Sequence, residues 1–221
     1  MLLEGSFGPI EDENKRGVIQ KMFEASQRLV MMIEDFLDIP RIEGGKMSYF
    51  FEKVSVSEFL DEVVSELKRT LKEGDYNITS FSEPELYIIA DKLKLRQVIT
   101  NLLDNAMKYS PRGTSIHLAA KDARGKVLLT IKDSGAGIPK EVMPRLFKKF
   151  SRGNAFAKLQ TEGRGLGLFI AKQIMTAHGG KVWLESEGRN MGTTACLEFQ
   201  QFIPSEKRQE IKEFVKEVGL S

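Results

Sequence analysis

Asn101-Leu-Leu-Asp-Asn105-Ala-Met-Lys108-Tyr109 is the stretch of sequence that says most about the fold and the site. Asn101, Asn105 and Lys108 are spaced i, i+4 and i+7, so on a helix they share one face. The apolar residues between them point elsewhere, toward a core. Amide oxygens and one ammonium on a single face suit Mg²⁺ bridging phosphates. Taken alone, the stretch fits a solvated helix face equally well.

A glycine-containing segment follows a predicted strand further along the chain. It reads Asp133-Ser-Gly135-Ala-Gly137-Ile138-Pro139. Gly135 and Gly137 permit positive φ and a close approach of ligand to backbone. Asp133, at the strand end, can accept a hydrogen bond from an exocyclic amine such as that of adenine. Glycine loops after strands are common, so this segment alone is weak evidence.

Two more glycine segments come later, Gly163-Arg-Gly165-Leu166-Gly167-Leu168 and Gly192-Thr193-Thr194. The first leads into a predicted helix, whose free N–H groups can bind phosphate. No strand closely precedes it and no Gly-Lys-Ser/Thr follows, which argues against both a dinucleotide fingerprint and a P-loop. The second opens the last predicted strand and means little by itself.

Hydrophobic periodicity around these segments alternates between helix and strand, which predicts a layered α/β or α+β domain. The predicted strands are 47–54, 78–81, 86–90, 115–120, 127–132, 181–187 and 193–200. The predicted helices are 11–39, 55–71, 92–109, 166–177 and 205–218. Pro40 is expected to end or kink the first helix. Ser55 and Glu58 form a capping-box pattern, and 151–164 reads as a mobile loop.

Composition and net charge argue against some classes of function. The chain has 221 residues, a net charge of +2 and one cysteine, Cys196, so no intrachain disulfide can form. The charge is too small to argue for nucleic acid. No apolar run reaches transmembrane length and no signal peptide is recognised, so we expect a soluble, cytoplasmic chain, with any membrane link through a region before Met1.

Taken together, the four segments resemble the asparagine box and the three glycine boxes of the sensor histidine kinase catalytic domain. Leu146-Phe147-Lys-Lys-Phe150 also resembles the phenylalanine box of that family. The resemblance covers 47–204. It implies an α+β fold, a two-layer α/β sandwich with a mixed sheet, preceded here by one long bundle helix.

The resemblance also implies a site for ATP and Mg²⁺. Asn105 with Asn101 would hold the metal, Asp133 would read adenine, and residues 151–164 would form the lid. Catalytic roles fall to Asn101, Lys108 and Arg152. The implied nucleotide contacts are Asn105, Tyr109, Asp133, Gly135, Gly137, Ile138, Phe150, Gly163, Gly165, Leu166, Gly167, Leu168 and Thr193. Related hydrolases carry a glutamate where this chain has Asn101, and an amide cannot take a proton from water, so transfer is favoured over hydrolysis.

The N-terminal part resembles half of a dimerisation hairpin. Residues 11–45 resemble its second helix, and the acceptor histidine would lie upstream of Met1. His117, in a predicted strand, and His178, at a helix end where an imidazolium would suit the dipole, are expected to be structural or solvated. The expected domains are 1–46, 47–204 and 205–221.

The implied partners are a response-regulator receiver domain and a second chain, identical or different, bound through the 11–39 helix. A regulatory ATP-binding module is the alternative function, and a plain ATPase is a weaker one. The C-terminal helix 205–218 is expected to dock as an amphipathic tail or to contact a partner.

Overall fold

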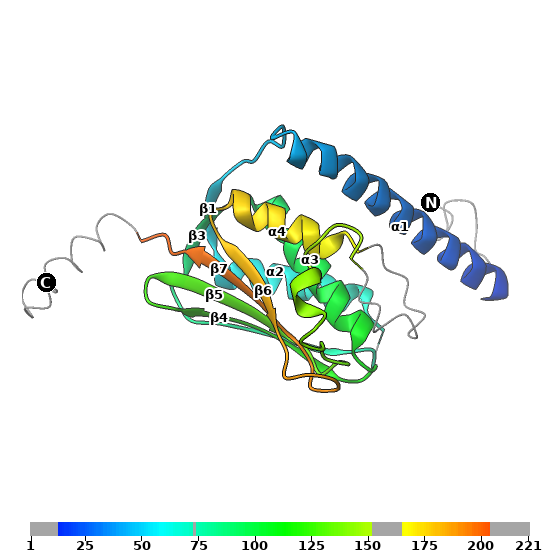
Figure 1. Cartoon of the computed structure of the whole chain (residues 1–221). Coiled ribbons are helices and arrows are strands. Elements are labelled where there is room, and N and C mark those ends of the chain that lie inside the picture. Colours follow the sequence, from blue (N-terminus) through cyan, green and yellow to red (C-terminus); the bar gives the residue numbers. More distant parts are fainter. Residues whose placement is uncertain (1–12, 73, 152–164, 204–221) are drawn as a thin grey trace, which may run out of the picture. The chain divides into compact units, whose positions relative to one another are not determined.

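The computed structural model describes residues 13–72, 74–151 and 165–203 (Figure 1). The chain divides into two compact units, 1–47 and 48–221. The predicted lid from Arg152 onward and the predicted helix 205–218 lie outside the described residues. The separation of a catalytic domain ending at 204 from that helix therefore stays a prediction.

The first unit contains helix α1, Glu13–Glu43. The expectation that Pro40 ends or kinks this helix near 39 is wrong about the end, because the helix continues through Pro40 to Glu43. The helix is ended by the glycine pair Gly44-Gly45. Lys46 N–H donates to Arg41 O (N···O 2.8 Å), Gly45 N–H donates to Ile42 O (3.1 Å), and Gly45 has φ +61°. A left-handed glycine with these two bonds is a helix C-terminal cap, which satisfies the last carbonyls.

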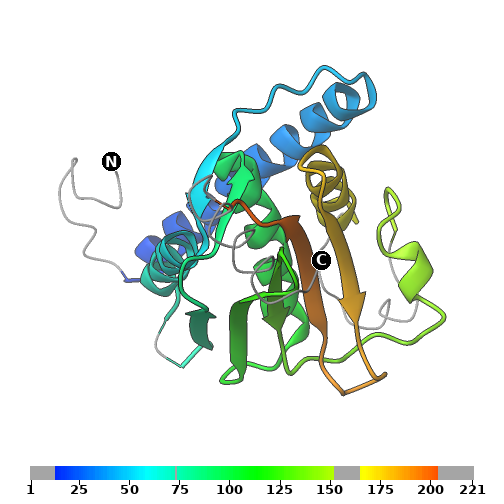
Figure 2. The ribbon, with the colours of Figure 1, turned by 90° about the vertical axis from the view of Figure 1, so that its left-hand side faces the viewer.

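The second unit is built on a mixed five-stranded sheet. The strands are β2 (Asn77–Ser82), β4 (Ser115–Asp122), β5 (Lys126–Lys132), β6 (Lys181–Glu185) and β7 (Thr194–Gln200), in the order β2-β4-β5-β7-β6. Strands β2 and β4 are parallel, and every other pair is antiparallel. Figure 2 shows the strands side by side. A separate antiparallel pair joins β1 (Glu52–Ser55) to β3 (Tyr87–Ala90).

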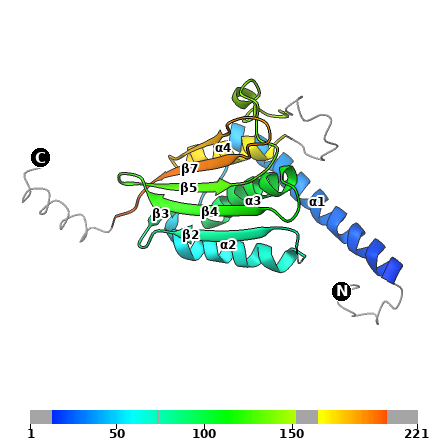
Figure 3. The same ribbon diagram turned by 90° about the horizontal axis from the view of Figure 1, so that it is seen from below.

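Three helices cover one face of the sheet (Figures 1 and 3). They are α2 (Val56–Thr70), α3 (Lys92–Tyr109) and α4 (Gly167–Ala177), and a short turn of 3₁₀ helix spans Met143–Arg145. Alternate residues of the central strands are buried beneath the helices, for example Ile116, Leu118, Leu129, Ile131 and Leu197. Each such side chain contributes about 1.5–3 kcal/mol of transfer free energy. The predicted α+β two-layer sandwich is confirmed.

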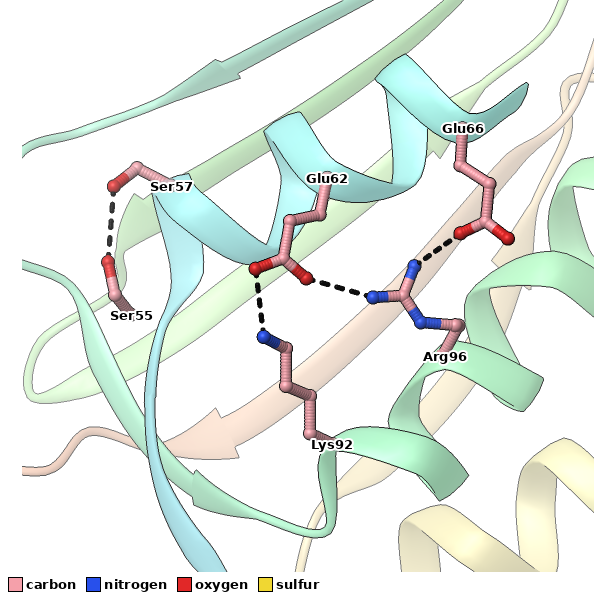
Figure 4. Close-up of polar contacts among 6 residues, drawn as sticks. All are labelled: Ser55, Ser57, Glu62, Glu66, Lys92 and Arg96. Carbon is pink, nitrogen blue, oxygen red and sulfur yellow. Dashed lines mark hydrogen bonds and ion pairs between the residues drawn. The ribbon is translucent and has the colours of Figure 1, made fainter. Parts of the chain in front are cut away.

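Most predicted boundaries agree with the structure within two residues, and α3 agrees at both ends. The strand predicted for 47–54 is too long, because only Glu52–Ser55 pairs, with β3. The capping box is also wrong. Ser55 is the N-cap of α2 but makes no side-chain cap bond, and its hydroxyl lies 3.3 Å from that of Ser57 (Figure 4).

Ion pairs join α2 to α3 (Figure 4). Glu62 contacts both Lys92 (2.8 Å) and Arg96 (2.9 Å), and Arg96 also contacts Glu66 (2.8 Å). The hydrogen bond from Lys92 is the main cause that lowers the pKa of Glu62. These groups are exposed, so the pairs fix how α3 lies against α2 more than they stabilise the fold.

Candidate nucleotide-binding site

Helix α3 presents the three polar residues of the opening stretch. Asp91 starts the helix by accepting hydrogen bonds from Leu93 N–H and Lys94 N–H, both at 3.0 Å. The opposite face is buried through Leu95, Val98, Ile99, Leu102, Leu103 and Ala106. That burial fixes the rotation of the helix, so Asn101, Asn105 and Lys108 remain partly accessible. The three polar residues therefore lie on one accessible face, as their spacing predicts.

Asn101 lies against the start of α4. A Cβ added to Gly167 would lie 3.4 Å from Cγ of Asn101. The Nδ2 atom of Asn101 is buried and has no hydrogen-bond partner among the described residues. Unsatisfied buried donors are uncommon in native proteins, so each needs a reason. Here the asparagine stretch and the glycine segment 163–168 meet around an amide whose Nδ2 has no hydrogen-bond acceptor among the described residues.

Asp133 joins the loop after β5 to the start of β7. Its Oδ1 accepts hydrogen bonds from Gly135 N–H (2.8 Å) and Thr193 N–H (3.0 Å), and its own N–H donates to Thr193 O (2.9 Å). Burial raises the pKa of the carboxyl group, and the two backbone bonds oppose that rise. No donor from the described residues bonds Oδ2. Two of the four sequence segments thus meet at one carboxylate that keeps an acceptor atom.

Gly135 and Gly137 occupy positions where a side chain cannot fit. A Cβ at Gly135 would lie 2.6 Å from the carbonyl oxygen of Tyr109, which accepts the N–H of Ala136 (3.0 Å). Gly137 has φ +64°, and a Cβ there would collide with the carbonyl of Gly188. The glycine loop is therefore clamped between the end of α3 and the loop before β7.

Ser186 is a supporting residue to which the sequence reasoning assigned no role. Its hydroxyl donates to Gly192 O (2.7 Å) and accepts the N–H of Ile138 (2.9 Å). One side chain therefore ties the loop of Ile138 to the turn that precedes Thr193. The sequence placed Ser186 inside the predicted strand 181–187, whereas β6 ends at Glu185, so its position in a loop carried no signal before the structure.

Residues 90–203 match the family described as "Histidine kinase-, DNA gyrase B-, and HSP90-like ATPase". This chain belongs to that family. Its catalytic unit is an ATP-binding domain of the histidine kinase type.

Sensor kinases are among the relatives of this kinase-type domain. The sensor histidine kinase WalK of Bacillus subtilis is 27% identical over 80% of this chain and 29% of its own length. The sensor-like histidine kinase SenX3 of Mycolicibacterium smegmatis is 28% identical over 98% of this chain and 56% of its own. The solved structure of the mycobacterial sensor histidine kinase MprB has a TM-score of 0.59 and 28% identity, covering 69% of this chain and 98% of that one.

The chain thus spans between about a third and a little over half of the two sensor kinases compared. Within the described residues of this kinase-type domain and α1, no helix is both long enough and apolar enough to cross a bilayer.

The glycine segment 163–168 of the kinase-type domain is partly described. Gly165 has φ +69° and lies on the backbone of Ser151, where a Cβ would be 2.8 Å from the carbonyl oxygen. Leu166 is buried and acts as the N-cap, so α4 begins at Gly167 rather than at 166. Phe150 has φ +55° and is 65% exposed. Arg152 and Gly163 lie outside the described residues.

The two histidines of the kinase-type domain have structural contacts. His117 is exposed on β4 and bonds Thr79 Oγ1 (2.8 Å), as expected for a solvated position. His178 Nε2 accepts the N–H of Asp91 (2.9 Å), and Nδ1 lies 2.8 Å from Ile174 O, so the ring is the neutral tautomer with its proton on Nδ1. Burial lowers the pKa of His178. The expectation of an imidazolium favouring the helix dipole is wrong, because the ring is desolvated and its Nε2 serves as an acceptor.

Proposed function

We propose that this chain binds Mg-ATP and transfers the γ-phosphoryl group to a histidine outside its own sequence. The observation that carries the proposal is the convergence of the four segments: Asn101 lies on Gly167, and Asp133 bonds Gly135 and Thr193. Residues separated along the chain meet around groups suited to adenine, a metal ion and phosphates. In the proposed step the histidine nitrogen attacks the γ-phosphorus, the bond to the β–γ bridging oxygen breaks, and ADP leaves.

The adenine end of the proposed site is Asp133. Its Oδ2 would accept the exocyclic amine, while Oδ1 is held by backbone donors. Gly135, Gly137, Ile138 and Thr193 would shape the surrounding wall. The phosphates would be lined by Tyr109, Gly165, Leu166, Gly167 and Leu168. The first N–H groups of a helix, here α4, are free to bind anions. Phe150, Gly163 and Arg152 would belong to the lid side.

The metal end of the proposed site is Asn105 with Asn101. Amide oxygens fit Mg²⁺ in chemistry, and both side chains are partly accessible on one helix face one turn apart. When bound, Mg²⁺ would neutralise charge on the β- and γ-phosphates. Lys108 lies on the same face, with Nζ 5.0 Å from the centroid of the Tyr109 ring, and would add a positive charge beside the phosphates.

Transfer is proposed over hydrolysis because of Asn101. A hydrolase of this fold needs a base for water, and an amide side chain does not take up a proton at neutral pH. In the structure Asn101 lies against Gly167, at the start of α4. Steady phosphate release that is abolished by Asn101→Ala would contradict this choice and favour an ATPase.

The acceptor would come from a partner chain. His178 already uses both ring nitrogens, and His117 lies on a strand bonded to Thr79. The helix α1 exposes large apolar residues, among them Val18, Met22, Leu29, Ile33 and Phe36. We infer that α1 pairs with helices of a second chain, identical or different, and that a receiver domain then takes the phosphate. Because ATP is the donor, the reaction is placed in the cytoplasm.

The decisive experiment supplies the acceptor separately. The full chain is mixed with Mg-ATP labelled at the γ-phosphate and a kinase of the same family whose own nucleotide site is inactivated but whose acceptor histidine is intact. Acid-labile phosphate should appear on the acceptor protein. Asn105→Ala should abolish both nucleotide binding and transfer, whereas Asn77→Ala, on an exposed strand position, should change neither. Intact Mg-ATP binding without any transfer would refute the kinase function.

A regulatory ATP-binding module is the second candidate, favoured by the same exposed face of α1. It predicts nucleotide binding and association with an intact kinase or a receiver, but no transfer. Sedimentation of the chain with each partner tests the association. Ile33→Asp, on the exposed face, should abolish it if α1 is the contact, and a chain that ignores both partners would count against this candidate.

A further inference from the structure

A second hollow lies at the end of α4 opposite the proposed nucleotide site. It is a surface pocket of about 460 Å³ beside the C-terminal residues of α4 and the last residues of β7. Its lining includes Phe51, Ile89, Ala177, His178, Phe199 and Phe202. The residues assigned to ATP lie at the other end of α4, at Gly165–Leu168, so the two sites are distinct.

The wall of this pocket is apolar and exposed. Phe51 is 49% exposed and Ile89 is 43% exposed. The His178 ring lies edge-on to Phe51, with a centroid distance of 5.0 Å. Aromatic and aliphatic surface gathered in a hollow, rather than scattered singly, marks a contact site.

The same wall is held in place by hydrogen bonds. His178 is fixed through both ring nitrogens, to Asp91 N–H and to Ile174 O. Phe202 N–H donates to Tyr87 O (2.7 Å), and Gln201 forms a bridge with Ile88. The pocket is therefore preformed, and an occupant need not reorganise it.

The chain itself leaves from the edge of the pocket. Phe202 lines the pocket, and the described part ends one residue later, at Ile203. Residues 205–218 follow in sequence, and their apolar members recur at helical spacing. They are Ile211, Phe214, Val215 and Val218. A helix over this range is about 21 Å long at about 1.5 Å per residue, and Ile211 would stand about 10 Å along it.

We propose that the pocket is the docking site of the chain's own C-terminal segment 205–218, whose apolar face covers Phe51, Ile89 and Phe202. The covalent connection to the pocket favours this segment over a second copy of the chain as the occupant. A segment attached next to its site is present at an effective concentration in the millimolar range, well above the concentration of a second copy in dilute solution. Docking also removes apolar surface of both partners from water.

Disulfide trapping in the full chain tests the proposal. Ile89→Cys with Phe214→Cys is compared with Phe81→Cys and Phe214→Cys, since Phe81 is 66% exposed on β2, away from the pocket. The native Cys196 is buried and burial raises its pKa to about 12, so it does not compete. Under mild oxidation the first pair should form an intrachain disulfide about ten times faster than the control pair. Equal rates, or disulfides only between chains, would overturn the proposal, the second outcome assigning the pocket to another copy.

Hydrogen exchange provides an independent test that needs no new thiol. Ile211→Ser with Phe214→Ser removes the docking face, and Lys212→Ser with Lys216→Ser is the matched control on the polar face. Residues 177–179 and 199–203 should exchange about tenfold faster in the first variant than in the control, because undocking uncovers them. The same exchange rates in both variants would show that the segment does not cover the pocket.

Discussion

Helices α1 and α3 are both amphipathic, yet they differ in what becomes of their apolar residues. In α3, residues such as Val98 and Ile99 are fully buried against α4 and the sheet. In α1, Val18, Met22, Leu29 and Ile33 are each more than half exposed. A sequence pattern therefore says that a helix has an apolar face, but not whether its own chain covers that face. The apolar face of α3 is covered within its own unit, whereas α1 has an exposed face that a partner can bury.

The largest expected effect is a loss of stability when a buried residue of α3 is truncated. Leu103→Ala, at 2% exposure on α3, should lower the free energy of unfolding by about 2–5 kcal/mol because it leaves a cavity. Ile33→Ala, at 58% exposure on α1, should change it by about 0.5 kcal/mol or less in dilute monomer. Urea unfolding followed by Trp183, the only tryptophan, reports on the catalytic unit. Equal losses of unfolding free energy in the two variants would show that the apolar face of α1 is covered.

Replacing one glycine in each unit by alanine should change stability in opposite directions. Gly137→Ala should cost about 1–3 kcal/mol and weaken ATP binding, because φ is positive and Cβ would meet the carbonyl of Gly188. Gly17→Ala lies within α1 with nothing within 4 Å, so it should stabilise that helix by about 1 kcal/mol. Thermal unfolding and nucleotide titration of both variants measure the difference. A neutral Gly137→Ala would contradict the clamped loop.

A smaller effect concerns the charge of Asp133. The carboxylate must be ionised to accept an amine, and burial raises its pKa, so ATP affinity should fall with decreasing pH before an ordinary aspartate would protonate. Asp133→Asn should bind ATP about tenfold more weakly at neutral pH and show no such fall. Isothermal titration of both proteins across pH cancels the titration of the nucleotide itself. Parallel pH profiles would remove Asp133 from the site.

The smallest effect is the pH dependence of stability through His178. Its folded pKa is lowered, so below the ordinary histidine pKa the unfolded chain binds more protons than the folded one. Stability should be fully present above about pH 6.5 and be lost as pH falls through the folded pKa, because protonation charges a buried ring whose Nε2 accepts a hydrogen bond. His178→Gln should flatten the profile between pH 7 and 5, and His117→Gln should not. Because α1 contains no histidine, this profile reports on the catalytic unit alone.

Local spacing in the sequence accounts for the geometry within each segment of the candidate site. The spacing of Asn101, Asn105 and Lys108 places them on one helix face because the helical period is fixed by backbone sterics and hydrogen bonding. The alternation in Val127, Leu129 and Ile131 determined which side of β5 is buried. Such features depend only on neighbours a few residues away, and they were predicted correctly.

Tertiary structure alone decided which distant segments meet. Asp133 and Thr193 are 60 residues apart and Ile138 and Ser186 are 48 apart, so no local pattern pairs them. The neutral state of His178 depends on Asp91, which is 87 residues away and reaches it only after folding. The end of α1 was misjudged because Pro40 removes one hydrogen bond, whereas the cap formed by Gly45 and Lys46 sets the stop. Periodicity reports which face is apolar, and only the packed chain shows what that face contacts.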